Sequence, residues 1–143
     1  GGWTLDETLE LARRLVARGA DWIDASSGGV SPAQKIPIGP GYQVPFARAI
    51  REATGATTMA VGMITEPAQA EAILQDGKAD IIAIAREMLC NPYWPTHAAK
   101  ALGLPDWLDV LPENYAFRLY PREQEFQRQK AGPPPEIPFR RKA

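Results

Sequence analysis

Cysteine, net charge and long apolar runs are all scarce in this sequence. Cys90 is the only cysteine, which excludes an intramolecular disulfide framework and fits a reducing compartment, so we expect a cytoplasmic protein. The formal net charge of −1 gives no reason to expect nucleic acid or an acidic membrane surface as a partner. No apolar run approaches the roughly 20 residues that cross a bilayer, and we see no pattern of a secretory signal.

The remaining composition is that of a globular domain. Of the 143 residues, 45% are hydrophobic and 23% are charged, which is sufficient for one core. The chain opens with Gly1 rather than Met, and a helical pattern starts almost at once, at Thr4. We expect from this abrupt opening that the chain is a piece of a longer protein.

Helical and apolar stretches alternate along the first hundred residues. The first helix is expected to begin at a capping box of Thr4 and Glu7 and to stop at Gly19. Thr65 is expected to cap a later helix. The pattern also predicts strands over 22–26, 58–61 and 80–85, an irregular loop over 27–42, helices over 45–53, 65–77 and 92–102, and a short helical stretch after Arg86.

Three near-continuous apolar strands, each followed by a helix, indicate an α/β fold with parallel strands buried on both faces. Three strands cannot close a barrel, which needs eight strands and roughly 250 residues. The pattern therefore leaves two possibilities open, a small open sheet and a piece of something larger.

The alternation ends at Leu104. Residues 104–120 mix apolar and aromatic side chains and read as an extension of the domain. Residues 121–143 are polar and basic and contain Gly-Pro-Pro-Pro at 132–135, so too few apolar groups remain to offset the entropy of ordering them. We expect this tail to be mostly disordered.

Candidate binding residues follow the three predicted strands, at 26–29, 62–65 and 85–87, because ligands bind at the carboxyl ends of parallel strands. Glycines at 28, 29 and 62 allow a ligand to approach the backbone, and the N–H groups after Gly62 and Ala85 favour an anion. The Arg86 guanidinium suits a phosphate. The alternative is that Arg86 pairs with Glu87 or a neighbouring helix and that the glycines only permit tight turns.

The other reactive side chains give weaker indications. Asp24 suits either orienting a ligand or pairing with a Lys or Arg, His97 fits a structural role better than catalysis, and Cys90 is expected to be a buried thiol. The four tryptophans are too scattered for an aromatic cage and suit packing. We find no metal-ligand spacing and no Rossmann or P-loop glycine pattern.

Several segments form a distinctive series along the chain. They are Gly1–Leu5, Asp21–Asp24, Ser26–Gly29, Pro37–Gln43, Val61–Thr65, Asp80–Leu89 and Asn91–Pro95. In this order and at this spacing they resemble the old yellow enzyme family of NADH:flavin oxidoreductases, and within it the bacterial NADPH dehydrogenases and xenobiotic reductases. The resemblance covers roughly residues 1 to 103.

The resemblance implies that residues 1–103 are the C-terminal part, about strands six to eight, of a (β/α)₈ TIM barrel that binds FMN. Backbone N–H groups, assisted by the Arg86 side chain, would hold the FMN phosphate, and two further residues would lie near the ribityl chain. The phosphate residues implied are Gly62, Met63, Ala85 and Arg86, and the ribityl residues are Ser27 and Gly28.

The implied activity is transfer of hydride from NAD(P)H through FMN to an activated alkene such as an enone, in a protein that is homo-oligomeric at full length. Relatives commonly have Gly at the position of Ala85. The family's substrate-binding histidines, proton-donating tyrosine and isoalloxazine contacts belong to the first half of the barrel, so no catalytic residue is implied here. Tyr115, Arg118 or Arg122 could reach a neighbouring subunit's site.

Two other interpretations remain open. One is a non-catalytic half-barrel that completes a barrel with a partner chain. The other is a different phosphate-binding barrel enzyme, for example an isomerase of sugar phosphates.

Overall fold

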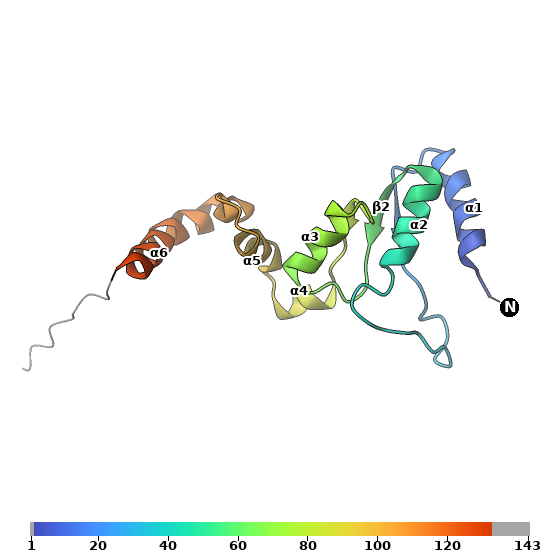
Figure 1. Cartoon of the computed structure of the whole chain (residues 1–143), viewed down its shortest axis with the longest axis horizontal. Helices are drawn as coiled ribbons and strands as arrows, with labels where there is room; N and C mark the ends of the chain where they lie inside the picture. The colour runs from blue at the N-terminus through green and yellow to red at the C-terminus, as the bar shows by residue number, and fades with distance from the viewer. Residues whose placement is uncertain (1, 133–143) are drawn as a thin grey trace, which may run out of the picture. The chain divides into compact units, whose positions relative to one another are not determined.

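The computed structural model describes residues 2 to 132 and divides the chain into two units after Trp94. The elements of the first unit are α1 (Leu5–Val16), β1 (Trp22–Ala25), α2 (Val44–Thr54), β2 (Thr57–Ala60), α3 (Pro67–Gln75), β3 (Ile81–Ile82) and α4 (Arg86–Cys90) (Figure 1). The helix α5 (Trp94–Ala101) begins at the boundary, and the 3-10 helix η1 (Trp107–Val110) and α6 (Glu113–Ala131) follow it. None of the described helices is both long enough and apolar enough to cross a membrane.

The three strands form one parallel sheet in the order β1-β2-β3, which confirms the predicted α/β arrangement. In the register, Ile23 lies beside Thr58, and Ala60 lies between Ala25 and Ile82. Because side chains alternate along a strand, these five residues share one face of the sheet. Parallel pairing also brings the carboxyl ends of all three strands to the same edge.

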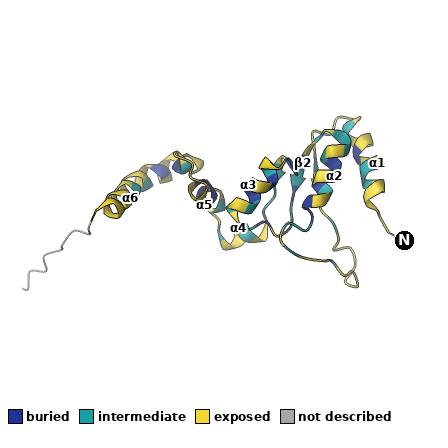
Figure 2. Cartoon of the chain, in the orientation of Figure 1, coloured by how far each residue is buried: buried dark blue, intermediate teal, exposed yellow. Residues whose placement is uncertain are grey.

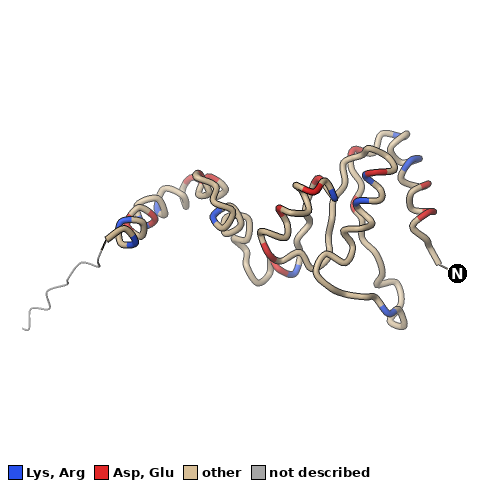
Figure 3. Tube along the Cα trace, viewed as in Figure 1, with Lys and Arg blue, Asp and Glu red and all other residues tan. Residues whose placement is uncertain are grey.

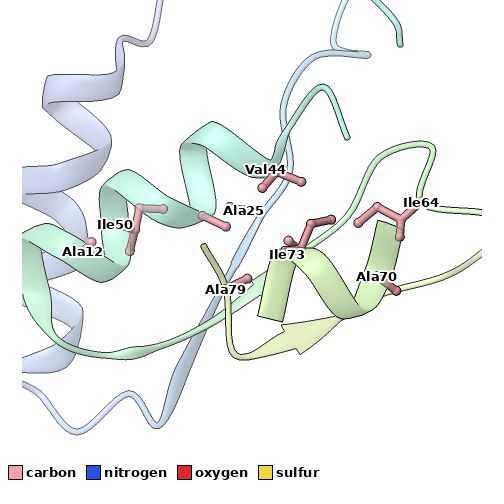
Figure 4. Packing of buried hydrophobic residues seen from close by; sticks show 10 residues of the cluster. Ala12, Ala25, Val44, Ile50, Ile64, Ala70, Ile73 and Ala79 are labelled. Atoms are coloured by element: carbon pink, nitrogen blue, oxygen red, sulfur yellow. The ribbon is translucent and has the colours of Figure 1, made fainter. Parts of the chain in front are cut away.

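Helices cover this face of the sheet. Ala25 and Ala60 are buried there, and Ile23 and Ile82 pack against the same cluster. Figure 4 shows the buried side chains of α2 and α3 gathered beside the strands, and Figure 2 shows the matching buried stripes on these helices. The buried members are Ala12, Ala25, Val44, Ala47, Ile50, Ala60, Ile64, Ala70, Ile73 and Ala79.

The opposite face of the sheet is not covered by described residues. Trp22, Asp24, Met59 and Ile81 belong to this face by their register, and Trp22 is 57% exposed. The prediction that the strands are buried on both faces is therefore wrong for this part of the chain. The reason is that one cluster, on one face, contains the core residues of α1, α2 and α3.

The start of α1 has the predicted capping box. The Glu7 N–H donates to the Thr4 hydroxyl oxygen at 3.3 Å, and the Thr4 N–H donates to the Glu7 carboxylate at 2.7 Å. The bonds from the Thr4 backbone and side chain lower the pKa of the Glu7 carboxyl. Two donors that the helix itself leaves unpaired are thereby satisfied.

The start of α3 differs from the prediction that Thr65 is its cap. The N-cap residue is Glu66, which makes no side-chain capping bond, and Pro67 follows it. Proline suits the first helical position because its missing N–H would be unpaired there in any case. The Thr65 backbone is used elsewhere, since its carbonyl accepts a 2.7 Å hydrogen bond from the Trp94 indole.

The C-terminal part also differs from the prediction. The helix α6 extends through residues 121–131, where disorder was expected, and residues 133–143 lie outside the described part. Glutamine and glutamate four residues apart support α6, with Gln127 donating to Glu123 at 2.8 Å and Gln129 to Glu125 at 3.0 Å. These local bonds favour the helix although Pro121 lies inside it.

Asp80 connects α2, β2 and β3 at the amino end of β3. Its carboxylate accepts hydrogen bonds from the Thr58 N–H at 2.9 Å and from the Arg51 guanidinium at 3.0 Å. The Thr58 amide first, and then Arg51, hold the pKa of the Asp80 carboxyl below its ordinary value, against the opposing effect of partial burial. A group with a lowered pKa stabilises the fold above its unfolded-state pKa and loses that effect as the pH falls.

We predict that Asp80→Asn lowers the free energy of unfolding by about 1 kcal/mol at pH 7, because charge-assisted bonds to a partly exposed carboxylate are lost. The difference from the unsubstituted protein should shrink as the pH falls from about 5 through the lowered pKa. Urea unfolding at several pH values measures both effects. Arg51→Met is the control, since it removes the ion pair and keeps the Thr58 bond. A pH-independent difference for Asp80→Asn would contradict the assignment.

Candidate functional site

A pocket of about 440 Å³ lies at the carboxyl edge of the sheet. It is formed by the segments that follow the strands, together with the end of the long loop that precedes α2. Four of the six residues predicted to bind the cofactor line it, namely Gly62, Met63, Ala85 and Arg86. The other lining residues are Ser26, Tyr42, Gln43, Val61, Ile64, Thr65, Ala83, Ile84, Glu87 and Cys90.

The turn after β2 has an unusual backbone at two consecutive residues. Gly62 has φ +116° and Met63 has φ +49°, the only positive φ of a non-glycine among the described residues. A left-handed non-glycine residue costs roughly 1–2 kcal/mol, and such costs collect at binding sites. Turns of this kind also form the concave backbone surfaces that bind anions. The geometry therefore fits the predicted role of these two residues.

Two side chains from the long loop pack directly against Gly62. A Cβ at this position would lie 2.8 Å from Cε1 of Tyr42 and 3.0 Å from Nε2 of Gln43. The Gly41 N–H also donates to the Gly62 carbonyl at 2.9 Å. Glycine is thus required at position 62 both by its φ and by the space that Tyr42 and Gln43 occupy.

The same turn is fixed from its other side by Gln69 and Trp94. The Gln69 amide donates to the Met63 carbonyl and accepts from the Thr65 N–H, both at 3.3 Å. The Trp94 indole bonds the Thr65 carbonyl. Tyr42, Gln43 and Gln69 were not predicted from the sequence as site residues. Tyr42 and Gln43 end a loop that follows a strand, just before a predicted helix, and two polar side chains at such a place could have indicated a site.

Ala85 and Arg86 approach the pocket from the neighbouring strand. The Ala83 N–H donates to the Ala60 carbonyl at 2.8 Å, which extends the pairing of β3 with β2 toward the pocket. Arg86 is exposed, and it forms no ion pair with any described residue. The alternative in which Glu87 or a neighbouring helix neutralises Arg86 finds no support in this part of the chain.

Ser27 and Gly28 lie beside the pocket rather than in its lining. The Ser27 N–H and hydroxyl both donate to the Gln43 carbonyl oxygen, the hydroxyl at 2.9 Å. At Gly28, with φ +79°, an added Cβ would overlap Cδ1 of Ile36, a residue of the same loop, so the absence of a side chain makes room for Ile36. The role of both residues near a ribityl chain stays a prediction.

The other reactive side chains are placed as follows. Cys90 is exposed and lines the pocket, so the expectation of a buried thiol is wrong; it is the last residue of α4, a helix with no buried residue. Asp24 is exposed on the uncovered face of the sheet and pairs with no described Lys or Arg. His97 is exposed on α5 and is outside the pocket lining.

Charge around the loop that follows β1 is sparse. Figure 3 shows charged residues mostly on the helices. Between residues 26 and 43, Lys35 alone is charged. Among the residues that line the pocket, Arg86 is the only cation and Glu87 the only carboxylate. An anion bound there would therefore depend on Arg86 and on backbone N–H groups.

A parallel α/β unit with this pocket matches a known family of flavin proteins. The model of the NADH:flavin oxidoreductase / NADH oxidase family matches residues 10–105, and the chain belongs to this family. The resemblance to old yellow enzymes is thereby confirmed.

The curated relatives are named NADPH dehydrogenase. Those of Geobacillus sp. (strain WCH70) and Bacillus licheniformis are 53% and 50% identical over 102 residues, which cover 71% of this chain. That of Halalkalibacterium halodurans is 53% identical over 103 residues, or 72% of the chain. The match spans 30% of the length of each of these relatives.

We predict that Gly62→Ala lowers the free energy of unfolding by about 2–4 kcal/mol, from left-handed strain and from overlap with Tyr42 and Gln43. Gly19→Ala is the matched control, because Gly19 has φ +92° and an added Cβ there meets nothing within 4 Å. Strain alone should cost the control about 1 kcal/mol. Urea unfolding of both variants gives the comparison. Equal losses would mean that Tyr42 and Gln43 do not enforce glycine at position 62.

Proposed function

We propose that this chain forms the phosphate-binding end of an FMN-dependent oxidoreductase that passes hydride from NAD(P)H to an activated alkene such as an enone. The observation that carries the proposal is the convergence of Gly62, Met63, Ala85 and Arg86 on one pocket. These residues come from segments that follow two neighbouring parallel strands, as in the phosphate sites of many barrels. Membership of a flavin oxidoreductase family supports the same ligand.

The pocket residues fit a phosphate in three respects. Gly62 and Met63 supply a left-handed turn that lines the pocket, and Gly62 places no side chain of its own between its backbone and a ligand. Ala85 adds only a methyl group at the start of α4. Arg86 brings a guanidinium without a competing carboxylate among the described residues, and its planar donors match phosphate oxygens.

The uncovered face of the sheet supports the further proposal that the strands are about the sixth to eighth of a (β/α)₈ barrel. In such a barrel helices cover the outer face of every strand, and the inner side chains pack against those of the other strands. Trp22, Met59 and Ile81 belong to the face that would point inward. The relatives, of which the match spans 30%, have the length to supply the other strands.

Each part of the proposed site has a distinct task. When bound, FMN supplies hydride transfer between a nicotinamide and the alkene. The residues of this chain bind and orient the phosphate: the turn at Gly62 and Met63 offers backbone donors, and Arg86 neutralises charge. Holding the phosphate would restrict the position of the bound cofactor. Catalytic side chains are proposed to lie in the rest of the barrel.

We predict that Arg86→Met raises the dissociation constant for FMN about tenfold in the complete protein, because an exposed charge-assisted bond to phosphate is lost. Riboflavin lacks the phosphate, so its affinity should stay within about twofold. Titration of the apoprotein with each flavin, followed by flavin fluorescence, measures both constants.

The control for this experiment is Arg18→Met, which removes an exposed arginine that is not in the pocket lining. It should leave both affinities unchanged. Equal affinities for FMN before and after the Arg86 substitution would overturn the proposed phosphate site. Competition by a sugar phosphate, with no flavin binding, would instead favour the sugar-phosphate isomerase.

We also predict that the 143-residue chain produced by itself shows no flavin absorbance and is poorly soluble or oligomeric. The uncovered sheet face and the unpaired edges of β1 and β3 favour association. Size-exclusion chromatography with detection at flavin wavelengths tests this. A yellow, monodisperse monomer would contradict the proposal that most of the flavin site lies outside this chain.

A further inference from the structure

Gln43 is a buried polar residue at the meeting point of three segments. It directly precedes α2 and is only 3% exposed. Its side chain contacts the segment after β1 through Ser27 and lies against the turn after β2 at Gly62. An amide at such a position is costly to bury unless its polar atoms have partners.

The hydrogen bonds of Gln43 determine which way its amide points. Its side-chain oxygen accepts from both the N–H and the hydroxyl of Ser27, the latter at 2.9 Å. A backbone N–H can only donate, so the amide atom that faces Ser27 must be the oxygen. The NH₂ group therefore points away from Ser27, toward Gly62.

The NH₂ group of Gln43 lies beside Gly62 at the pocket lining. Nε2 would lie 3.0 Å from a Cβ at Gly62, and Gln43 is part of the pocket lining. No described residue accepts a hydrogen bond from this nitrogen, yet no buried side-chain nitrogen or oxygen in the described part lacks a partner. Both statements hold only if the nitrogen is accessible to solvent, and the cavity that Gln43 lines is this pocket.

We propose that Gln43 is a ligand-binding residue whose side-chain NH₂ donates a hydrogen bond to a phosphate oxygen of the flavin, while its carbonyl oxygen holds Ser27. This inference rests on the proposed function of the pocket. Phosphate oxygens only accept, and the NH₂ group only donates, so the two match. Its place beside Gly62, whose N–H is a proposed phosphate donor, assigns it to the phosphate rather than to the ribityl hydroxyls.

In this proposal the oxygen and the nitrogen of the Gln43 amide affect ligand binding in different ways. Its oxygen orders the segment that follows β1, which would matter for any ligand of the pocket. Its nitrogen distinguishes a ligand with a phosphate from one without. A variant that retains the oxygen and replaces the nitrogen separates the two effects, and Gln43→Glu has this property, since one carboxylate oxygen can still accept from Ser27.

The experiment uses the complete protein with Gln43→Glu, and it compares FMN with riboflavin by fluorescence titration at fixed ionic strength. We expect the dissociation constant for FMN to rise about tenfold or more, because a donor is replaced by a negative oxygen facing the phosphate. The constant for riboflavin should change less than about threefold. Gln34→Glu adds the same charge to the exposed part of the same loop and should change neither constant.

A second variant keeps the test valid if Gln43→Glu is poorly folded. Gln43→Met conserves size but loses both the donor and the acceptor. It should lower the affinity for FMN more than that for riboflavin, and it should also lower the melting temperature, because Ser27 loses its partner.

Each outcome decides the proposal. A selective loss of FMN affinity in the Gln43 variants supports it. An equal loss for FMN and riboflavin overturns it, since Gln43 would then contact the ribityl chain or act only on the fold. Unchanged FMN affinity in Gln43→Glu also overturns it, and the proposed function still stands if Arg86→Met retains its selective loss. If neither variant affects FMN, both proposals fail.

Discussion

The pocket depends on the parallel pairing of β2 with β1 on one side and β3 on the other. Parallel strands end at the same edge, so one set of hydrogen bonds brings together segments that are far apart in the sequence. Asp80 fixes the amino end of this pairing by binding the Thr58 amide, and the Ala83 N–H extends it at the carboxyl end. A shift in this register would move Gly62 relative to Arg86, because the two residues follow the paired strands β2 and β3.

Small side chains allow the helices to lie close to the sheet. Six of the ten buried residues in the core cluster are alanines, among them Ala47 and Ala60, both fully buried. Close packing of small residues leaves little room for substitution, since even one added methylene is felt in a well-packed interior. Gln43, which is 3% exposed, directly precedes Val44, a member of this core.

The helices and strands of the first unit could be predicted from the sequence, but the packing around the strands and the helix at 121–131 could not. Apolar periodicity identifies the strands and helices of residues 1–94, and the Thr4–Glu7 box marks the start of α1, because these features are local. The apolar sequences of the strands suggested that both faces of the sheet are buried, but an apolar sequence does not identify the residues that pack against each face. The helix at 121–131 was missed because proline and polarity were weighed more heavily than the glutamine–glutamate spacing.

Only some residues of the candidate site could be predicted from the sequence. Gly62 and Arg86 follow strands, so their approach to one edge follows from topology. Gln43 and Tyr42 come from the end of an irregular loop, and their contact with Gly62 depends on the path of that loop, which sequence periodicity does not encode.

The brevity of β3 links the pocket to local motion. Its ladder with β2 has two residue pairs, Met59 with Ile81 and Ala60 with Ile82, and one backbone hydrogen bond flanks it at each end, so few hydrogen bonds oppose its separation. A ligand held by both Gly62 and Arg86 binds only when the strands are paired, and its binding free energy therefore adds to the cost of opening β3. Exchange of the Ala83 amide hydrogen, which donates to the Ala60 carbonyl at the end of this pairing, would then slow as the ligand concentration rises, which makes the end of β3 a local reporter of occupancy.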